Sequence, residues 1–382
     1  MLCAMLPFDY QPRTRLIFGA GTLSRVGQLA RELGGTRVLV VTDVGIVAAG
    51  HAQRALESLR SEGLFATMFD GVRENPDASD VERCVAVARG EGVDLFVGLG
   101  GGSAMDTAKG ANFVLTNGGQ IADYKGIGKA SLPMLPLIAI PTTAGTGSEC
   151  QSFALISDPV SHLKMACGDP KAAAKIALLD PELTLSQPPR VTVCTGIDAL
   201  VHALETAVTK KRGALSQMFS REAFRLCIHA LPRVLSMPGD LEARGQMQLG
   251  AAYAGMAIEN SMLGCTHSAA NPLTAKYGVA HGHAVGLLAM GVLRRNLQNA
   301  AAAAEYLALA QHAGLNSVDE LQTHFAALLP LAGLRVSLSQ LGVTRESLPE
   351  MAAEAAMQWT ASFNPVEYSV LDFEGLYHEV LA

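Results

Sequence analysis

The pattern of apolar and polar positions divides the chain into two halves. In the first half, short apolar runs rich in β-branched residues alternate with stretches of helical period. Strands are predicted at residues 15–18, 36–43, 65–69 and 135–141, and in the apolar run that starts at residue 94. Helices are predicted at residues 23–33, 51–63, 77–91 and 104–114. This alternation indicates a parallel sheet with helices on both faces.

The second half has a helical period almost throughout and no strand-like alternation. Helices are predicted at residues 191–208, 214–229, 246–262, 284–297, 300–313, 318–331, 348–357 and 373–380. The prolines of the segment Ser186–Pro189 interrupt regular structure at the point where the composition changes. We therefore predict two domains, residues 1–187 and residues 188–382.

Composition narrows the class of protein. With 382 residues, 49% hydrophobic and 17% charged, the chain can bury a core in each of two globular domains. The net charge of −6 is spread without basic runs, so we expect small-molecule partners and neither nucleic acid nor an anionic membrane. No apolar run reaches the roughly 20 residues of a membrane-spanning helix, and residues 1–8 lack the basic start of a signal peptide. Seven cysteines without a C-x-x-C pair indicate reduced thiols and a cytoplasmic protein.

One helical stretch carries the pattern of a metal site. Asp198 and His202 are one helical turn apart in the apolar run from Ile197 to Val208, so their side chains lie on the same face. An unpaired carboxylate would be costly to bury there, and a divalent cation is its natural partner. His267 and His281 can complete the site. The alternative is that each residue is an ordinary hydrogen-bonded polar group of the core.

Two loops have the pattern of a nucleotide site. Gly100, Gly101 and Gly102 follow an apolar strand, and Ser103 stands where a helix begins, so a pyrophosphate could approach the backbone and the helix start. The alternative is a flexible turn. The hydroxyl-rich loop 142–149 could bond a nucleotide without charge, or could bond its own backbone. Its candidate residues are Thr142, Thr143, Thr146 and Ser148. The earlier Gly19-Ala20-Gly21 is a plain turn, because a third glycine is not at the fingerprint position.

Asp43 ends the second predicted strand, at the edge where parallel sheets bind ligands. A carboxylate there can bond ribose hydroxyls and repel a 2′-phosphate, which predicts NAD as cofactor in preference to NADP. The alternative is that Asp43 caps a helix or turn.

Three segments together resemble one known family. Residues 195–205, Gly264–His267 and Ala280–Gly282 are similar to the metal-binding motifs of the iron-containing (group III) alcohol dehydrogenases, and the similarity extends over nearly the whole chain. The resemblance implies an α/β N-terminal domain with a parallel Rossmann-like sheet, residues 1–187, that binds a nicotinamide dinucleotide. It also implies an all-α C-terminal domain, residues 188–382, that binds the metal and carries the catalytic site.

The same resemblance implies roles for individual residues. It makes Asp198, His202, His267 and His281 the ligands of one divalent metal, with iron(II) favoured and zinc possible. It places Gly100, Gly101, Gly102 and Ser103 at the cofactor diphosphate, and loop 142–149 over the adenine, ribose and phosphate. Leu183 lies in a further family-like strand end. Asp106 and Lys109 fall near the nicotinamide, although a solvated pair on a helix is the alternative.

One position departs from the family pattern. The family commonly has a second histidine four residues after the ligand that matches His267, and this chain has Asn271. Asparagine forms hydrogen bonds but carries no proton near neutral pH. We therefore expect Asn271 to position a substrate that has a second oxygen function. The alternative is a helix-ending asparagine before Pro272.

The implied reaction is hydride transfer between a nicotinamide cofactor and an alcohol or aldehyde, with the metal polarising the substrate oxygen. Related branches are the alternatives: glycerol dehydrogenases, maleylacetate reductases and the dehydroquinate synthase lyases. Asp198 and loop 142–149 favour the alcohol dehydrogenase branch, whose members commonly form dimers or larger homo-oligomers. A non-enzymatic protein would leave four metal-type residues unexplained.

Overall fold

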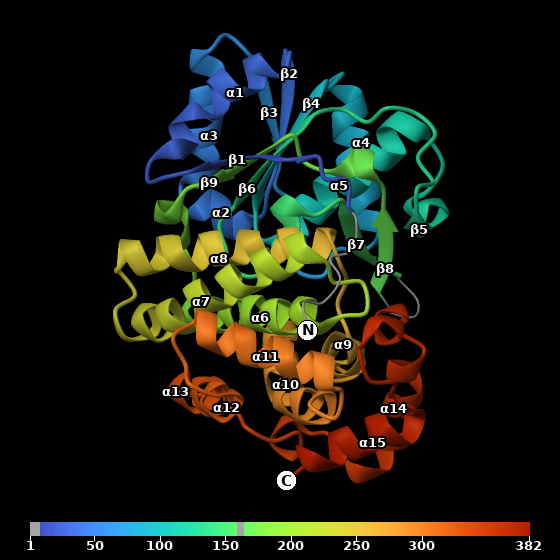
Figure 1. Cartoon of the computed structure of the whole chain (residues 1–382). Coiled ribbons are helices and arrows are strands. Elements are labelled where there is room, and N and C mark those ends of the chain that lie inside the picture. The colour runs from blue at the N-terminus through green and yellow to red at the C-terminus, as the bar shows by residue number, and fades with distance from the viewer. Residues whose placement is uncertain (1–7, 159–163) are drawn as a thin grey trace. The chain divides into compact units, whose positions relative to one another are not determined.

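The computed structural model describes residues 8–158 and 164–382 (Figure 1). Its contacts divide these residues into two compact units, with a boundary between Gln187 and Pro188. One unit contains residues 10–143 and 147–187, and the other contains residues 8–9, 144–146 and 188–382. Residues 1–7 lie outside the described residues. They include Cys3 and most of the segment on which the prediction about a signal peptide depends.

The first unit is built on a parallel sheet of six strands in the order β1-β9-β6-β4-β2-β3. All five strand pairs are parallel. The strands are β1 (Arg15–Phe18), β2 (Arg37–Val41), β3 (Phe65–Phe69), β4 (Leu95–Gly100), β6 (Leu137–Pro141) and β9 (Ile176–Leu179). The predicted α/β class with a parallel sheet is confirmed.

Helices cover both faces of this sheet because its central strands are apolar on both sides. Val38 and Val40 of β2 pack in one core with α1 (Val26–Glu32) and α3 (His51–Ser61), while Leu39 and Val41 pack in the other with α4 (Ala78–Gly90) and α5 (Gly102–Asn117). Figure 1 shows α1 and α3 on one side of the strands and α4 and α5 on the other. The strand period of two thus produces a three-layered unit.

Parallel strands bring the predicted nucleotide-binding segments to one edge of the sheet. β2 leads into Asp43 and α2 (Val44–Ala48), β4 leads into α5, and β6 leads into Thr142 and Thr143. β9 leads into the 3-10 turn Pro181–Ser186. Since all these strands point the same way, the segments that follow them share the carboxyl edge, where sheets of this kind bind ligands.

A second, three-stranded sheet was not predicted. It consists of β5 (Gly126–Ile127), β8 (Lys164–Gly168) and β7 (Phe153–Ser157), in that order. β7 and β8 pair antiparallel, from Phe153 opposite Gly168 to Ser157 opposite Lys164. These strands are two to five residues long and contain glycine, alanine and lysine, so their local pattern is weak.

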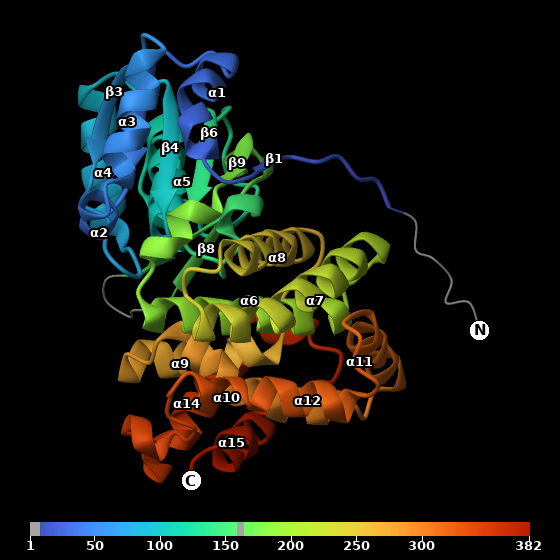
Figure 2. The ribbon, with the colours of Figure 1, turned by 90° about the vertical axis from the view of Figure 1, so that its left-hand side faces the viewer.

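The second unit is helical, as predicted. Its helices are α6 (Pro189–Val208), α7 (Ala214–Ser236), α8 (Leu241–Glu259), α9 (Cys265–Tyr277), α10 (His281–Asn296), α11 (Ala300–His312), α12 (Val318–Ala326), α13 (Leu328–Leu331), α14 (Leu348–Ala356) and α15 (Val370–Glu379). Figure 2 shows α6 crossing the middle of the unit, with α7 and α8 on one side and α9 and α10 on the other. By length and composition α6 could span a membrane, but 89% of its most apolar window is buried inside the protein. It is the core helix of the unit.

The helix α9 was not predicted, because Pro272 lies in its interior. Proline removes a backbone donor and disfavours helical geometry at the residue before it. Burial of Ala269, Ala270 and Leu273 in the helical core offsets this cost. The predicted helix 318–331 is divided in the structure into α12 and α13.

A close approach between α6 and α10 fixes the position of the residue next to His281. A Cβ atom on Gly282 would lie 1.8 Å from the carbonyl oxygen of Cys194. This neighbour is backbone, so it cannot turn aside as a side chain could. The two helices can therefore pack this closely only with glycine at position 282.

We predict that Gly282→Ala lowers stability by about 1–3 kcal/mol or more, because α10 must move away from α6. Gly375→Ala in α15 is the matched control, since a Cβ there meets nothing within 4 Å. Alanine favours helix over glycine, so this control should be neutral or slightly stabilising. Thermal unfolding of both variants measures the difference, and equal melting temperatures would contradict the close approach.

Candidate metal centre and nucleotide-binding loops

Three helices bring one carboxylate and three imidazoles together. Asp198 and His202 lie one turn apart on α6, His267 lies in the first turn of α9, and His281 is the first residue of α10. The Nε2 atoms of His202, His267 and His281 lie 3.4, 3.5 and 3.8 Å from Oδ1 of Asp198. The four predicted metal ligands are therefore neighbours in the structure.

These distances fit a shared metal ion better than hydrogen bonds. Good N–H···O bonds are about 2.9 Å long, whereas metal–nitrogen bonds of about 2.1 Å in a tetrahedron separate the ligand atoms by about 3.4 Å. Ligand atoms of Asp198, His267 and His281 all lie within 4.8 Å of one another. Oδ1 of Asp198 and Nε2 of His267 are buried and have no hydrogen-bond partner among the described residues. A cation would satisfy both atoms, so the donor set fits a divalent metal.

The charges at this site favour an ionised carboxylate. Burial opposes ionisation of Asp198, but the imidazoles of His202, His267 and His281 outweigh it and hold the pKa of Asp198 below its usual range. Burial lowers the pKa of His202. For His267, Glu205 and Asp198 outweigh the effect of burial and raise the pKa to about 9. Since imidazole binds a metal only through an unprotonated nitrogen, the metal must compete with a proton at His267.

Glu205 is a further residue of this site, to which the sequence analysis assigned no role. It follows Asp198 by seven residues on α6 and is buried. Its Oε2 lies 2.6 Å from Nδ1 of His267 and accepts a 3.0 Å bond from the backbone N–H of Gly264. Its Oε1 accepts a 2.6 Å bond from the N–H of Thr266. The available signal was the spacing 198, 202, 205, which places all three side chains on one face of a helix.

Two nearby polar residues have partners outside this cluster. Nε2 of His283 lies 2.7 Å from the carbonyl oxygen of Arg335, so this ring nitrogen is engaged by the backbone. Asn271 lies one turn after His267 on α9, and its Nδ2 donates a 3.1 Å bond to Oε1 of Gln358. Since α9 continues to Tyr277, the alternative that Asn271 ends a helix is wrong.

In the other unit, Asp43 lies beside Gly100 of the predicted phosphate loop. Its Oδ1 accepts bonds of 2.8 and 3.1 Å from the N–H groups of Gly45 and Ile46, so Asp43 is the N-cap of α2. Its Oδ2 lies 3.4 Å from the position that a Cβ on Gly100 would take. The capping alternative is therefore present in the structure, and it uses only one of the two carboxylate oxygens.

The predicted phosphate loop is the start of α5, which begins at Gly102, two residues earlier than expected. Its N-cap is Gly101, which supplies no capping side chain. The first N–H groups of a helix point outward and favour an anion, so this start is suited to a phosphate. Gly100 has φ +152°, and its carbonyl accepts a 2.9 Å bond from Thr142, which joins this turn to the hydroxyl-rich loop.

Asp106 and Lys109 are buried in the same unit, so the alternative of a solvated helix pair is wrong. Nζ of Lys109 donates to the carbonyl oxygen (2.6 Å) and the hydroxyl (2.9 Å) of Ser148, and to the carbonyl oxygen of Phe153 (3.0 Å). The hydroxyl of Ser148 donates a 2.8 Å bond to Asp106, and burial raises the pKa of this carboxyl. The two residues thus hold Ser148 and the end of loop 142–149 in place.

The remaining loop residues differ in exposure. Thr142 is buried, Thr143 and Thr146 are half-buried, and Gly101 lies against Thr143. Oγ1 of Thr143 has no hydrogen-bond partner in the part of the chain that the structure describes, so it can bond a ligand. The side chain of Leu183 is fully buried in the core that contains α1 and α3, so it packs there and offers only its backbone to a cofactor.

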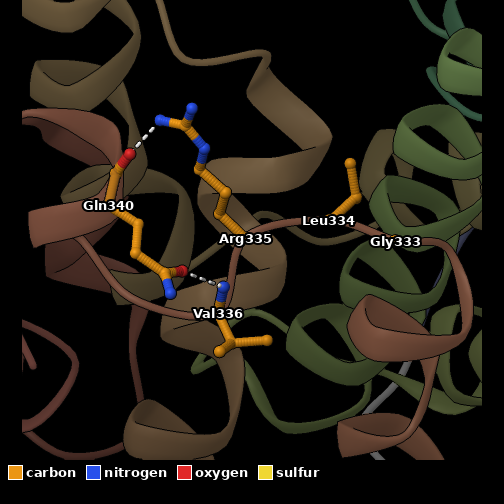
Figure 3. Close-up of a pocket in the computed structure, with 5 residues that line it drawn as sticks. All are labelled: Gly333, Leu334, Arg335, Val336 and Gln340. Carbon is orange, nitrogen blue, oxygen red and sulfur yellow. Dashed lines mark hydrogen bonds between the residues drawn. The ribbon is translucent and has the colours of Figure 1, made fainter.

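A pocket of about 540 Å³ in the helical unit contains none of these residues (Figure 3). It is lined by Gly333, Leu334, Arg335, Val336 and Gln340. Figure 3 shows that the polar groups are bonded to one another. The guanidinium of Arg335 donates to the backbone carbonyl of Gln340, and the N–H of Val336 donates to the side-chain oxygen of Gln340. This pocket is therefore not the candidate site.

A parallel α/β unit with an uncapped glycine-rich helix start, together with a helical unit carrying a carboxylate–imidazole cluster, is typical of a metal-dependent dehydrogenase. Comparison with known protein families agrees. Residues 12–181 match the family described as iron-containing alcohol dehydrogenase, and residues 192–381 match the C-terminal domain of the Fe-containing alcohol dehydrogenase family. The chain belongs to the iron-containing alcohol dehydrogenase family.

Individual relatives cover nearly the whole chain. Alcohol dehydrogenase 4 of Schizosaccharomyces pombe is 33% identical, over 92% of this chain and 84% of its own length. The NAD-dependent methanol dehydrogenase of Bacillus methanolicus is 32% identical, over 96% of this chain and 97% of its own. A crystal structure of 1,3-propanediol oxidoreductase superposes with a TM-score of 0.92 at 31% identity, covering 98% of this chain and 100% of that one. The protein is an alcohol/aldehyde oxidoreductase.

Proposed function

We propose that this protein is an NAD-linked, iron-dependent alcohol dehydrogenase that also works as an aldehyde reductase. The observation that carries the proposal is the approach of three imidazole Nε2 atoms to one buried carboxylate oxygen, at 3.4–3.8 Å. Asp198, His202, His267 and His281 would hold the metal. When bound, the metal supplies Lewis acidity to the substrate oxygen.

The protein's own residues provide binding and positioning for the hydride transfer. In this proposal residues 1–187 form the dinucleotide-binding domain and residues 188–382 the metal-binding domain. The uncapped start of α5 would bind the cofactor diphosphate, with Gly100, Gly101, Gly102 and Ser103 around it. Thr142, Thr143 and Thr146 would bond the nucleotide, and Asp106 and Lys109 would act through Ser148, which they hold. Leu183 would contribute its backbone.

The proposals of iron as the metal and of NAD as the cofactor rest on different observations. One carboxylate and three imidazoles suit several divalent metals, so the family favours iron(II) and leaves zinc as the alternative. The NAD-dependent methanol dehydrogenase and the half-buried Asp43 support NAD. We also propose a cytoplasmic homodimer or larger homo-oligomer. The six described cysteines are buried thiols, in keeping with a reducing compartment.

The related branches are less well supported. Maleylacetate reductases tend to lack the metal carboxylate, whereas Asp198 is buried among three histidines here. Glycerol dehydrogenases use zinc, so metal identity separates them. A lyase of the dehydroquinate synthase kind would show no net oxidation of NADH by aldehydes.

Metal analysis combined with an NADH-oxidation assay over a series of aldehydes tests the proposal, with Asp198→Ala as the comparison variant. Asp198→Ala removes the only charged ligand, so we expect it to lose bound metal and to lose turnover while its circular dichroism stays unchanged. The unmodified protein should contain about one metal per chain and oxidise NADH. Full metal occupancy and activity in Asp198→Ala would rule out Asp198 as a ligand.

We predict that the enzyme prefers NAD and that Asp43→Gly relaxes this preference. Oδ2 of Asp43, which lies beside Gly100, can accept bonds from ribose hydroxyls and repels a 2′-phosphate. Asp43→Asn is the matched control, because it retains a capping oxygen for Gly45 and Ile46 and removes the charge. Its kcat/KM for NADP should rise as well. Equal kcat/KM values for both cofactors in the unmodified enzyme would leave Asp43 as a helix cap only.

We predict that Asn271 positions a substrate with a second oxygen. Asn271→Ala should raise KM for hydroxylated or carboxylated aldehydes far more than for alkyl aldehydes of similar size, because only the former lose a hydrogen bond. Gln358→Ala is the control, since it removes the partner of Asn271 Nδ2 and leaves the Asn271 amide in place. An equal effect of Asn271→Ala on both aldehyde classes would give Asn271 a structural role.

A further inference from the structure

We infer that Glu205 is a positioning residue that fixes which ring nitrogen of His267 carries the hydrogen, and so keeps Nε2 available to the metal. The inference rests on the proposed metal site and assigns a role there to a residue that is not itself a ligand. Glu205 acts on His267 through Nδ1, the ring nitrogen opposite the one that approaches Asp198.

The number of donors and acceptors around Glu205 determines the arrangement. Its two oxygens receive the N–H of Gly264, the N–H of Thr266 and Nδ1 of His267, at 3.0, 2.6 and 2.6 Å. An ionised carboxylate only accepts hydrogen bonds, so Nδ1 of His267 must be the donor. A neutral imidazole with hydrogen on Nδ1 has its lone pair on Nε2. Nε2 of His267 is the atom that lies 3.5 Å from Asp198.

The same carboxylate fixes the backbone that carries the ring. His267 is in the first turn of α9, and the N-cap of this helix is Gly264, which has no capping side chain. Glu205 replaces that cap by accepting from Gly264 and Thr266, and its negative charge lies at the positive end of the helix dipole. A Cβ at position 264 would lie 2.8 Å from Oδ1 of Asn364 and 3.2 Å from Oε1 of Glu205, so glycine leaves room for both side chains at this helix start.

Asn364 supports the same helix start without touching the ring. Its Oδ1 accepts a 3.3 Å bond from the N–H of Cys265. Its Nδ2 donates 2.7 Å bonds to Oδ1 of Asn296 and to the carbonyl oxygen of Val366. Asn364 and Glu205 therefore share the capping of α9, but only Glu205 contacts the imidazole of His267. This difference separates a structural role from a positioning role.

The test is the affinity of the metal-free protein for Zn²⁺, measured by competition with a chromophoric chelator. Glutamine in Glu205→Gln has one acceptor oxygen and a donating NH₂ group in place of two acceptors. With this NH₂ toward His267, the ring can pair with it only by moving its hydrogen to Nε2, which blocks the metal. With the NH₂ toward Thr266, the ring still loses the negative charge that holds its hydrogen on Nδ1. We expect affinity to fall about 10- to 100-fold. Spectra of ¹⁵N-labelled histidine in the metal-free protein, recorded above the pKa of His267 so that the ring is neutral, should show less hydrogen on Nδ1 in Glu205→Gln than in the unmodified protein.

Asn364→Ala is the matched control. It removes a cap from α9 and should lower the melting temperature, but Zn²⁺ affinity should stay close to that of the unmodified protein. Glu205→Asp keeps two acceptor oxygens and should retain more affinity than Glu205→Gln. Glu205→Asp also provides the test if Glu205→Gln does not fold. In that case, a Zn²⁺ affinity of Glu205→Asp no higher than that of Glu205→Ala would contradict the inference.

Two results would overturn the inference: unchanged Zn²⁺ affinity in Glu205→Gln, or affinity losses in Glu205→Gln and Asn364→Ala that follow their melting temperatures equally. These results differ from a failure of the proposed function. In that case the unmodified protein would bind Zn²⁺ no better than Asp198→Ala, whatever residue occupies position 205.

Discussion

The burial of one negative charge, the Asp198 carboxylate, constrains the arrangement of the helical unit. Asp198 lies on α6, the most enclosed helix of this unit, where an isolated ion would be strongly destabilising. The structure surrounds it with imidazoles from α6, α9 and α10. These three helices must therefore keep fixed positions relative to one another. The absence of a side chain at Gly282 allows α10 to approach α6. The capping of α9 by Glu205 and Asn364 fixes the start of this helix and so the position of His267 in its first turn.

The residues that are adjacent on one element could be predicted from the sequence, and those that meet through tertiary contacts could not. The i, i+4 spacing of Asp198 and His202 and the apolar runs of β2, β4 and β6 are local patterns, and the structure contains them as expected. The burial of Lys109 depends on Ser148 and Phe153, 39 and 44 residues away. The helix α9 was missed for the same reason, because packing offsets the cost of Pro272. Resemblance to the family, and not spacing alone, joined His267 and His281 to the pair on α6.

Polar side chains in both units serve the same physical purpose, which is to hold backbone N–H or C=O groups in place. Asp43 caps α2, Glu205 and Asn364 cap α9, and Lys109 holds the carbonyl oxygens of Ser148 and Phe153. A side chain used in this way holds the backbone in place and is itself held by the same hydrogen bonds. This is why Asp43 can cap a helix through Oδ1 while Oδ2 remains beside the glycine turn, and why a capping role and a cofactor role do not exclude each other.

The contrast between the starts of α9 and α5 indicates where an anion can bind. At α9 the first N–H groups are occupied by protein side chains, including a carboxylate, so a phosphate would meet negative charge and no free donor. At α5 the N-cap is Gly101 and no side chain caps the helix, while the flanking Gly100 adopts φ +152°, a conformation that residues with a Cβ rarely adopt. Both helices have glycine as the N-cap residue. The helix start proposed to support the metal and the helix start proposed to bind phosphate thus differ in whether a distant carboxylate reaches the first turn.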